Sequence, residues 1–304
     1  MEITKNLKDQ KSDLFDYFRT RSEELISEIE AKYGDRQFKK KAKASNILLI
    51  KTCNNLINTV LQQADEEKWT NKEKLENILM ITYTSNIVML ESRNSFWPYE
   101  YMTFSRRIGE IWEPFCKLCF KYPVNDIKYF VPPLFSKVKE DLTQEIKLFI
   151  DSLNISPEQK EQLKKYYDQV WGYVTSGEIK LELDLHFSFN KEKYVIDFKS
   201  GFGSNEKGNT NRLLLVASIY KNMKEKYNCL LFVRSAQNNH YFNTLKNSGV
   251  WEAYSGEDTY AQIHKYSGYD ISNWIKTNIK WKEDINATTY EHLESNDLLQ
   301  YLDW

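Results

Sequence analysis

The chain has 304 residues, of which 41% are hydrophobic and 28% are charged, and this composition is typical of a globular protein rather than a disordered one. The formal net charge of −1 gives no general support to a nucleic-acid partner, so any basic contact surface has to be local. No apolar run is long enough to span a membrane, and the first residues, MEITKNLKDQKSD, lack the apolar core of a signal peptide. We therefore expect an intracellular, cytoplasmic protein without a membrane segment.

The first 98 residues are expected to form a helical N-terminal region. Apolar residues recur at helical spacing over residues 13–34, 44–64 and 71–90. A basic run, RQFKKKAK at 36–43, lies between the first two of these segments. Such a run is usually the solvated start of a helix, and contact with phosphate groups is the alternative.

Residues 102–122 continue the helical pattern and contain a C-x-x-C pair, Cys116 and Cys119. The chain has four cysteines, which are too few and too scattered for a disulfide framework. A zinc site would need a second pair of ligands at a suitable spacing, and the sequence has none. We expect buried free thiols.

The middle of the chain combines a loop with a well-marked helix start. Residues 122–135 contain three prolines and are predicted to be a loop. The next helix is predicted to begin at Ser156, which is a typical N-cap residue. Pro157 follows at the first helical position, and Gln159 completes a capping-box pattern.

From Leu181 the apolar residues alternate with polar ones, which predicts a strand over 181–190. Further strands are predicted at 193–200, 229–235 and 249–256, and helices at 210–227, 257–268 and 269–279. The sequence therefore predicts an α/β (α+β) chain with two parts. Residues 1–98 form the helical region, and residues 99–304 form an α/β core with closing C-terminal helices.

The first two predicted strands bring charged side chains together if they form a hairpin. A link centred on residues 191 and 192 makes Lys199 the partner of Asp184, and Asp197 the partner of His186. Side chains alternate between the two faces, so Asp184, Asp197 and Lys199 share one face. The leucines and phenylalanines of 181–189 then share the other face. A link of odd length would separate the two aspartates.

Two neighbouring carboxylates repel each other unless a cation neutralises them. A hard divalent cation such as Mg²⁺ prefers oxygen ligands and leaves positions open for water and phosphate. A lysine on the same face, here Lys199, can orient or activate the attacking water. The alternative is an ordinary cross-strand Asp–Lys pair on a solvent-facing strand.

This arrangement resembles the PD-(D/E)XK nuclease superfamily and, within it, the type II restriction endonucleases. Asp184 is followed twelve residues later by Asp197-Phe198-Lys199, which looks like the (D/E)-x-K motif on the next strand. Gly109 and Glu113 look like the G-x-x-x-E of the preceding helix. Glu110 is a rival for this helical carboxylate, because Pro114 directly follows Glu113.

The resemblance implies a restriction-endonuclease-like core, in which helices flank a central mixed β-sheet. It also implies one or two Mg²⁺ ions held by Asp184, Asp197, Glu113 and the carbonyl of Phe198, with Lys199 acting on water. The polar segment that follows, together with a pair of arginines before Glu113, supplies candidate contacts to DNA. These candidates are Asn205, Lys207, Asn209, Asn211, Arg212, Arg106 and Arg107.

The function that the resemblance implies is Mg²⁺-dependent, sequence-specific hydrolysis of phosphodiester bonds in double-stranded DNA. We expect such an enzyme to act as a homodimer on a palindromic site and to be paired with a DNA methyltransferase. Two alternatives stay open. One is another nuclease with the same core, such as a repair or junction-cutting enzyme, and the other is a non-catalytic DNA-binding protein.

Overall fold

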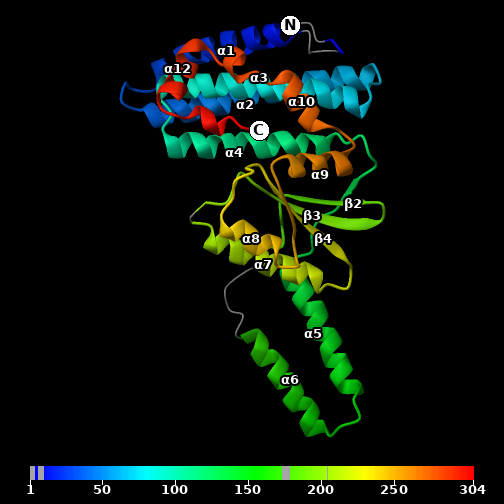
Figure 1. The fold of residues 1–304 in the computed structure, drawn as a ribbon. Helices are drawn as coiled ribbons and strands as arrows, with labels where there is room; N and C mark the ends of the chain where they lie inside the picture. The colour runs from blue at the N-terminus through cyan, green and yellow to red at the C-terminus, as the bar shows by residue number, and fades with distance from the viewer. Residues whose placement is uncertain (1–3, 6–9, 173–178, 204) are drawn as a thin grey trace.

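The computed structural model describes residues 4–5, 10–172, 179–203 and 205–304. These residues form a mostly helical α/β fold with twelve α-helices and one five-stranded sheet (Figure 1). The strands are β1 (Lys128–Tyr129), β2 (Leu185–Phe189), β3 (Glu192–Lys199), β4 (Tyr227–Val233) and β5 (Glu252–Ser255). They lie in chain order across the sheet. The first three are antiparallel and the last three are parallel, so the sheet is mixed, as predicted. The short strand β1 was not predicted, because it lies within the stretch 122–135 that was expected to be a loop.

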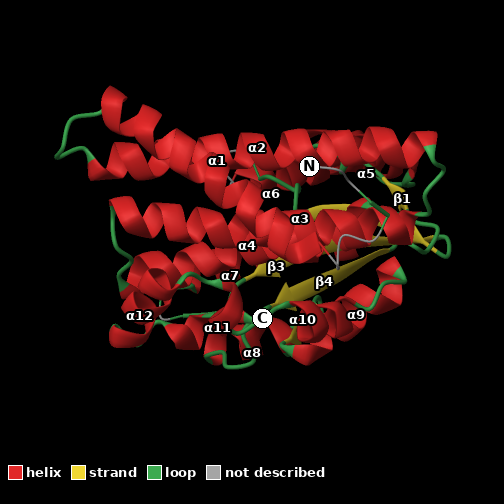
Figure 2. Cartoon of the chain, turned by 90° about the horizontal axis from the view of Figure 1, so that it is seen from above, coloured by secondary structure: helices red, strands yellow, loops and turns green. Residues whose placement is uncertain are grey.

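Both ends of the chain contribute to a helical layer on one face of the sheet (Figure 1). From the N-terminal part come α1 (Lys11–Lys32), α2 (Phe38–Glu66), α3 (Asn71–Phe96) and α4 (Tyr101–Lys121). From the C-terminal part come α9 (Glu257–Ser267), α10 (Ile271–Asn278), α11 (Trp281–Asp284), α12 (Ala287–Ser295) and the 3₁₀ turn η2 (Leu299–Tyr301). Seen from above, the long helices run roughly parallel to one another (Figure 2). The predicted N-terminal helices and the closing helices α9 and α10 are confirmed, whereas α11 and α12 were not predicted.

Polar contacts join the two ends of the chain inside this layer. The buried carboxylate of Asp284 accepts hydrogen bonds from Lys11 Nζ (2.7 Å) and from the Tyr83 hydroxyl (2.6 Å). The buried Glu91 of α3 pairs with Arg19 of α1 (2.8 Å) and also accepts a hydrogen bond from the Asn286 amide at the start of α12 (2.7 Å). One apolar cluster runs from Leu14 through these helices to the sheet. The region 1–98 therefore shares its core with residues 99–304.

The four cysteines are all buried and free, as predicted. Burial raises the pKa of the Cys119 thiol on α4, which favours its neutral form.

Among the described residues, no helix combines the length and the apolar character needed to cross a membrane.

The opposite face of the sheet is covered by α7 (Lys207–Lys221) and α8 (His240–Lys246) (Figure 1). A second apolar cluster joins Val195 and Leu231 of the sheet to Leu213 and Phe242 of these helices. Strand β4 is buried along most of its length, as its apolar sequence predicts. Helix α7 was predicted, whereas α8 was not.

The link between β2 and β3 is a two-residue turn at Asn190 and Lys191, which have φ values of 50° and 69°. Positive φ at both positions is typical of a type I′ hairpin turn. The link has the even length that was assumed, but it lies one residue earlier, so the register differs by two residues. His186 pairs with Val195, and the predicted pairs Asp184–Lys199 and Asp197–His186 are therefore wrong.

Strand β2 is also shorter than predicted, because it begins at Leu185 rather than at Leu181. Leu181 and Leu183 lie before it and pack into the cluster beside α7, on the face opposite to Phe187. His186 is buried, and its Nε2 accepts a hydrogen bond from the Leu183 amide (3.2 Å). Burial lowers the pKa of this imidazole, so His186 fills space rather than adding charge.

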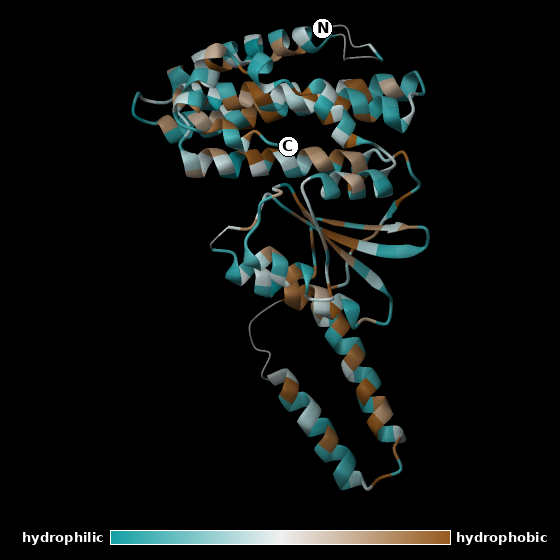
Figure 3. Cartoon of the chain, in the orientation of Figure 1, coloured by the Kyte–Doolittle hydropathy of each residue, from teal (hydrophilic) through white to brown (hydrophobic). Residues whose placement is uncertain are grey.

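Helices α5 (Phe135–Ser152) and α6 (Pro157–Gly172) form a hairpin that projects away from the sheet (Figure 1). The predicted capping box at the start of α6 is confirmed. The Gln159 amide donates to Ser156 Oγ (3.3 Å), and the Ser156 amide donates to Gln159 Oε1 (3.0 Å). Apolar segments occur along both helices (Figure 3), although Ile150 is the one buried apolar residue in their described part.

Helix α4 passes closely over the end of β3 at Gly109. A Cβ atom at this position would lie 2.6 Å from Ser200 Cβ and 2.7 Å from Ser200 Oγ. Glycine therefore lets the helix backbone approach the strand one turn before Glu113.

We expect Gly109→Ala to lower the free energy of unfolding by about 1–3 kcal/mol, because α4 has to move away from Ser200. Chemical denaturation followed by circular dichroism measures this change. Gly208→Ala in α7 is the matched control, since its Cβ would meet nothing within 4 Å and alanine favours a helix. Equal stability of Gly109→Ala and the wild type would contradict the close approach.

Candidate active site

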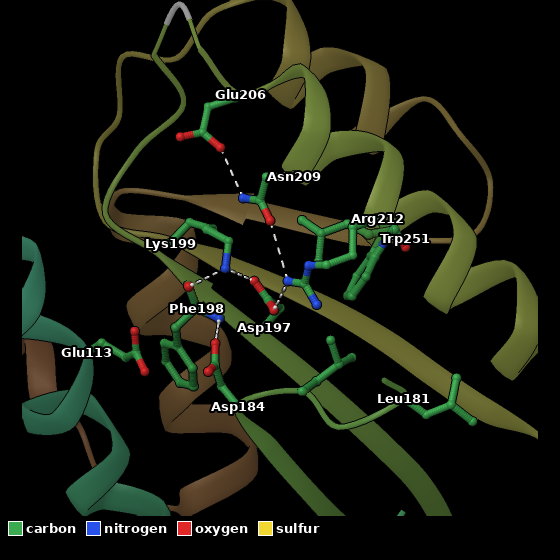
Figure 4. A network of polar contacts seen from close by, with 12 residues as sticks. Glu113, Leu181, Asp184, Asp197, Phe198, Lys199, Glu206, Asn209, Arg212 and Trp251 are labelled. Atoms are coloured by element: carbon green, nitrogen blue, oxygen red, sulfur yellow. Dashed lines mark hydrogen bonds and ion pairs between the residues drawn. The ribbon is translucent and has the colours of Figure 1, made fainter. Parts of the chain in front are cut away.

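The predicted site residues Asp184, Asp197 and Lys199 lie together where β2 begins and β3 ends (Figure 4). Asp184 directly precedes β2, and Lys199 is the last residue of β3. Continuing the observed register by one pair places Asp184 opposite Asp197. The two aspartates thus come together as expected, although their partners in the hairpin differ from the prediction.

Asp197 is the most buried charged group of the site, with 3% of its surface exposed. Its carboxylate pairs with Lys199 Nζ on one oxygen and with Arg212 of α7 on the other (Nη2–Oδ2 3.3 Å). Burial raises the pKa of Asp197, and the nearby Asp184 carboxylate raises it further. The charges of Lys199 and Arg212 oppose this shift without cancelling it.

Asp184 is held by the backbone of β3. Its Oδ2 accepts a hydrogen bond from the Phe198 amide (2.7 Å), and its Oδ1 lies 3.4 Å from Lys117 Nζ. The Phe198 ring is buried in the core below, while the Phe198 carbonyl accepts a hydrogen bond from Lys199 Nζ (3.1 Å). About a quarter of the Asp184 side chain is exposed, at 28%, so solvent and small ligands can reach it.

The structure distinguishes the two glutamates that compete for the helical position. Glu113 Oε1 accepts a hydrogen bond from Lys117 Nζ (2.7 Å), and the same ammonium group contacts Asp184. Glu110 instead pairs with Arg106 and Arg107 on its own helix (2.7 and 3.3 Å). Helix α4 continues through Pro114, so Glu113 lies within a helix rather than at its start. Glu113 is thus the glutamate that α4 directs toward the aspartates (Figure 4).

Lys117 is a site residue that the sequence reasoning missed. It lies one helical turn after Glu113, and the i, i+4 spacing of a glutamate and a lysine is the signal that could have found it. That spacing is common on solvated helices, and nothing in it indicates the further contact with Asp184.

The predicted DNA contacts fall into separate groups. Arg212 donates to Asp197, and its Nη2 also donates to Asn209 Oδ1 (3.4 Å). Asn209 in turn donates to Glu206 (3.0 Å), a residue that was not predicted (Figure 4). The structure leaves three of the predicted residues exposed around the start of α7, namely Asn205, Lys207 and Asn211.

Arg106 and Arg107 lie apart from this polar chain. Arg106 is largely exposed, with 81% of its side chain accessible. Arg107 is more buried, and its guanidinium group donates to the sulfur of Met89 on α3 (2.9 Å). Both arginines contact Glu110, and α4 does not bring either of them into contact with Asp197.

The available ligand atoms are of the chemical type that Mg²⁺ binds, although the described side chains do not form a complete set of ligands. Asp184, Asp197, Glu113 and the Phe198 carbonyl offer the oxygen ligands that Mg²⁺ prefers. The buried Asp197 Oδ1 forms an ion pair with Lys199 Nζ and has no hydrogen bond of good geometry, so the fold leaves this acceptor without a hydrogen-bond donor. Across the described ranges, no three histidine, cysteine, aspartate or glutamate side chains converge as a ready-made metal cluster.

Comparison with known proteins gave no match. No protein-family model fits the chain, and neither the curated proteins nor the solved structures contain a match to it.

We expect Asp197→Asn to raise the free energy of unfolding at neutral pH by about 1 kcal/mol, and therefore to raise the melting temperature. The folded-state pKa of Asp197 is raised, so its stabilising protonated form is lost as the pH rises through that pKa. Asparagine does not ionise, and its advantage over aspartate should therefore shrink as the pH is lowered. The exposed Asp126→Asn is the control. A variant that is less stable than the wild type at neutral pH would contradict this sign.

Proposed function

We propose that the protein is a metal-dependent endodeoxyribonuclease of the type II restriction class, which cuts double-stranded DNA at a specific sequence. The observation that carries the proposal is that Asp184, Asp197 and Lys199 lie together where β2 begins and β3 ends. Glu113 adds weight, because it reaches the same place from the helix that crosses β3.

The order of the elements also supports a restriction-endonuclease-like core. Three antiparallel strands are followed by α7 and by β4, which is parallel to β3. This is the helix and buried strand that the family resemblance expects after the (D/E)-x-K motif. Helix α4 precedes the sheet and carries Gly109 and Glu113 in the expected order.

The residues of the site have separate roles in the proposed hydrolysis. Asp184 and Asp197 would hold Mg²⁺ together with the Phe198 carbonyl, and Glu113 would act directly or through water. Bound Mg²⁺ supplies a Lewis acid that polarises the phosphate and lowers the pKa of a water molecule. Lys199 Nζ, held by Asp197 and the Phe198 carbonyl, can donate to the attacking water or to a phosphate oxygen.

Contacts to DNA are proposed at the start of α7, next to the aspartates. The exposed Asn205, Lys207 and Asn211 can reach phosphates or base edges, whereas Asn209 and Arg212 link that surface to Asp197. Arg106 is a phosphate contact only if DNA extends along α4, because it lies with Arg107 and Glu110. We further propose an intracellular homodimer that is paired with a DNA methyltransferase, as the resemblance implies.

A non-catalytic DNA-binding protein is the second candidate function. The observation that favours it is that lysines already pair with the carboxylates, Lys117 with Asp184 and Lys199 with Asp197. A related nuclease that acts on DNA structure rather than on sequence is a further alternative within the same chemistry. Discrete cleavage fragments favour the restriction enzyme, and cleavage confined to branched or damaged DNA favours the other nuclease.

We expect the protein with Mg²⁺ to cut unmethylated phage DNA into discrete fragments, and a chelator to stop the reaction. Asp197→Ala and Lys199→Ala should each slow cleavage by about 10²-fold or more, because each removes a charged group from the reacting centre. Gel electrophoresis of the products measures the rate.

The helical glutamates provide the matched control for this experiment. Glu113→Gln should lower the rate, whereas Glu110→Gln should leave it near that of the wild type. Tight binding to DNA without cleavage would support the non-catalytic candidate. Equal cleavage by the wild type and Asp197→Ala would overturn the proposed site.

A further inference from the structure

The formal charges of the site cancel in the absence of a metal. Three carboxylates, those of Glu113, Asp184 and Asp197, are in contact with three cations, which are Lys117, Lys199 and Arg212. A divalent cation that enters such a neutral cluster meets side-chain cations at short range. At least one of them therefore has to move or lose its contacts when the metal binds.

Lys117 is the one of these three cations whose hydrogen-bond and ion-pair partners are carboxylates alone. Lys199 is also held by the Phe198 carbonyl, and Arg212 is also held by Asn209. Lys117 Nζ has Glu113 and Asp184 as its polar partners and lies 5.7 Å from the centre of the Phe198 ring. Its position between two carboxylates is one that a metal ion bound by both would occupy.

The surroundings of Lys117 give the side chain room to leave. A groove of about 400 Å³ adjoins it, between α4 and the edge of the sheet at β1 and β2. Pro114, Leu118 and Lys121 line the groove on α4, and Tyr129 and Leu185 line it on the strands. The flexible four-carbon stem of lysine can lie along these apolar surfaces while its ammonium group stays in water.

We propose that Lys117 is a built-in counter-ion that holds Glu113 and Asp184 in place before a metal binds and is displaced by the metal. This inference rests on the proposed metal site and adds a determinant of its affinity. Lys117 keeps the two carboxylates close together and protects the fold from their repulsion. In return, it weakens metal binding, because the metal has to break both of its ion pairs.

The test is a calorimetric titration with Mn²⁺ alone, without DNA. Lys117→Met should bind Mn²⁺ about tenfold more tightly than the wild type, because the competing cation is gone. Lys121→Met is the matched control, since it removes the same charge one turn further along α4, where the contact of Lys121 is with the Tyr122 ring. Its affinity should stay at the wild-type value. Lys117→Arg keeps the charge and should also bind like the wild type.

A thermal melt gives a second measurement, which also shows whether the variants fold. Lys117→Met leaves two carboxylates without their cation, so Mn²⁺ should raise its melting temperature more than that of the wild type. Mn²⁺ binding by Lys117→Met that is equal to or weaker than wild-type binding would overturn the inference while leaving the metal site intact. If no variant binds Mn²⁺, the metal site of the proposed function fails, and the role of Lys117 fails with it.

Discussion

A carboxylate that is almost fully buried at the end of an inner strand determines the arrangement around it. Asp197 has 3% of its surface exposed, and burial of its charge has to be offset by nearby cations. Lys199 comes from the same strand and Arg212 from the following helix, so the ion pair of Asp197 with Arg212 joins β3 to α7. The offset is incomplete, as the raised pKa shows, and such a balance is typical of a site that serves function rather than stability.

The helical layer gives this site its rigid support. Asp284 pairs with Lys11 of α1, and Glu91 of α3 accepts a hydrogen bond from the Asn286 amide at the start of α12, so both ends of the chain are joined. The apolar cluster of these helices packs α4 against the sheet. Because Gly109 allows α4 to approach Ser200 closely, Glu113 and Lys117 reach the end of β3 from outside the sheet. Helices far from the aspartates thus decide how precisely the glutamate is positioned.

Local sequence patterns predicted most of the helices and strands, but they did not predict the contacts between these elements. The even hairpin link brought Asp184 and Asp197 to one place, because side-chain parity depends only on whether the link is even or odd. The exact register depended on the turn at Asn190, and the late start of β2 at Leu185 depended on how Leu181 and Leu183 pack beside α7. The second contact of Lys117 depends on the path of α4 across the sheet, which no local pattern contains.

The place of the α5–α6 hairpin in the chain has a consequence for how the protein can vary. Strands β1 and β2 are hydrogen-bonded neighbours, yet the whole hairpin lies between them in the sequence. It is therefore an insertion that begins and ends at one edge of the sheet, and it contributes little to either apolar cluster. Its length and surface can change without altering the order of the strands, so the hairpin and the cluster around Asp197 can vary independently of each other.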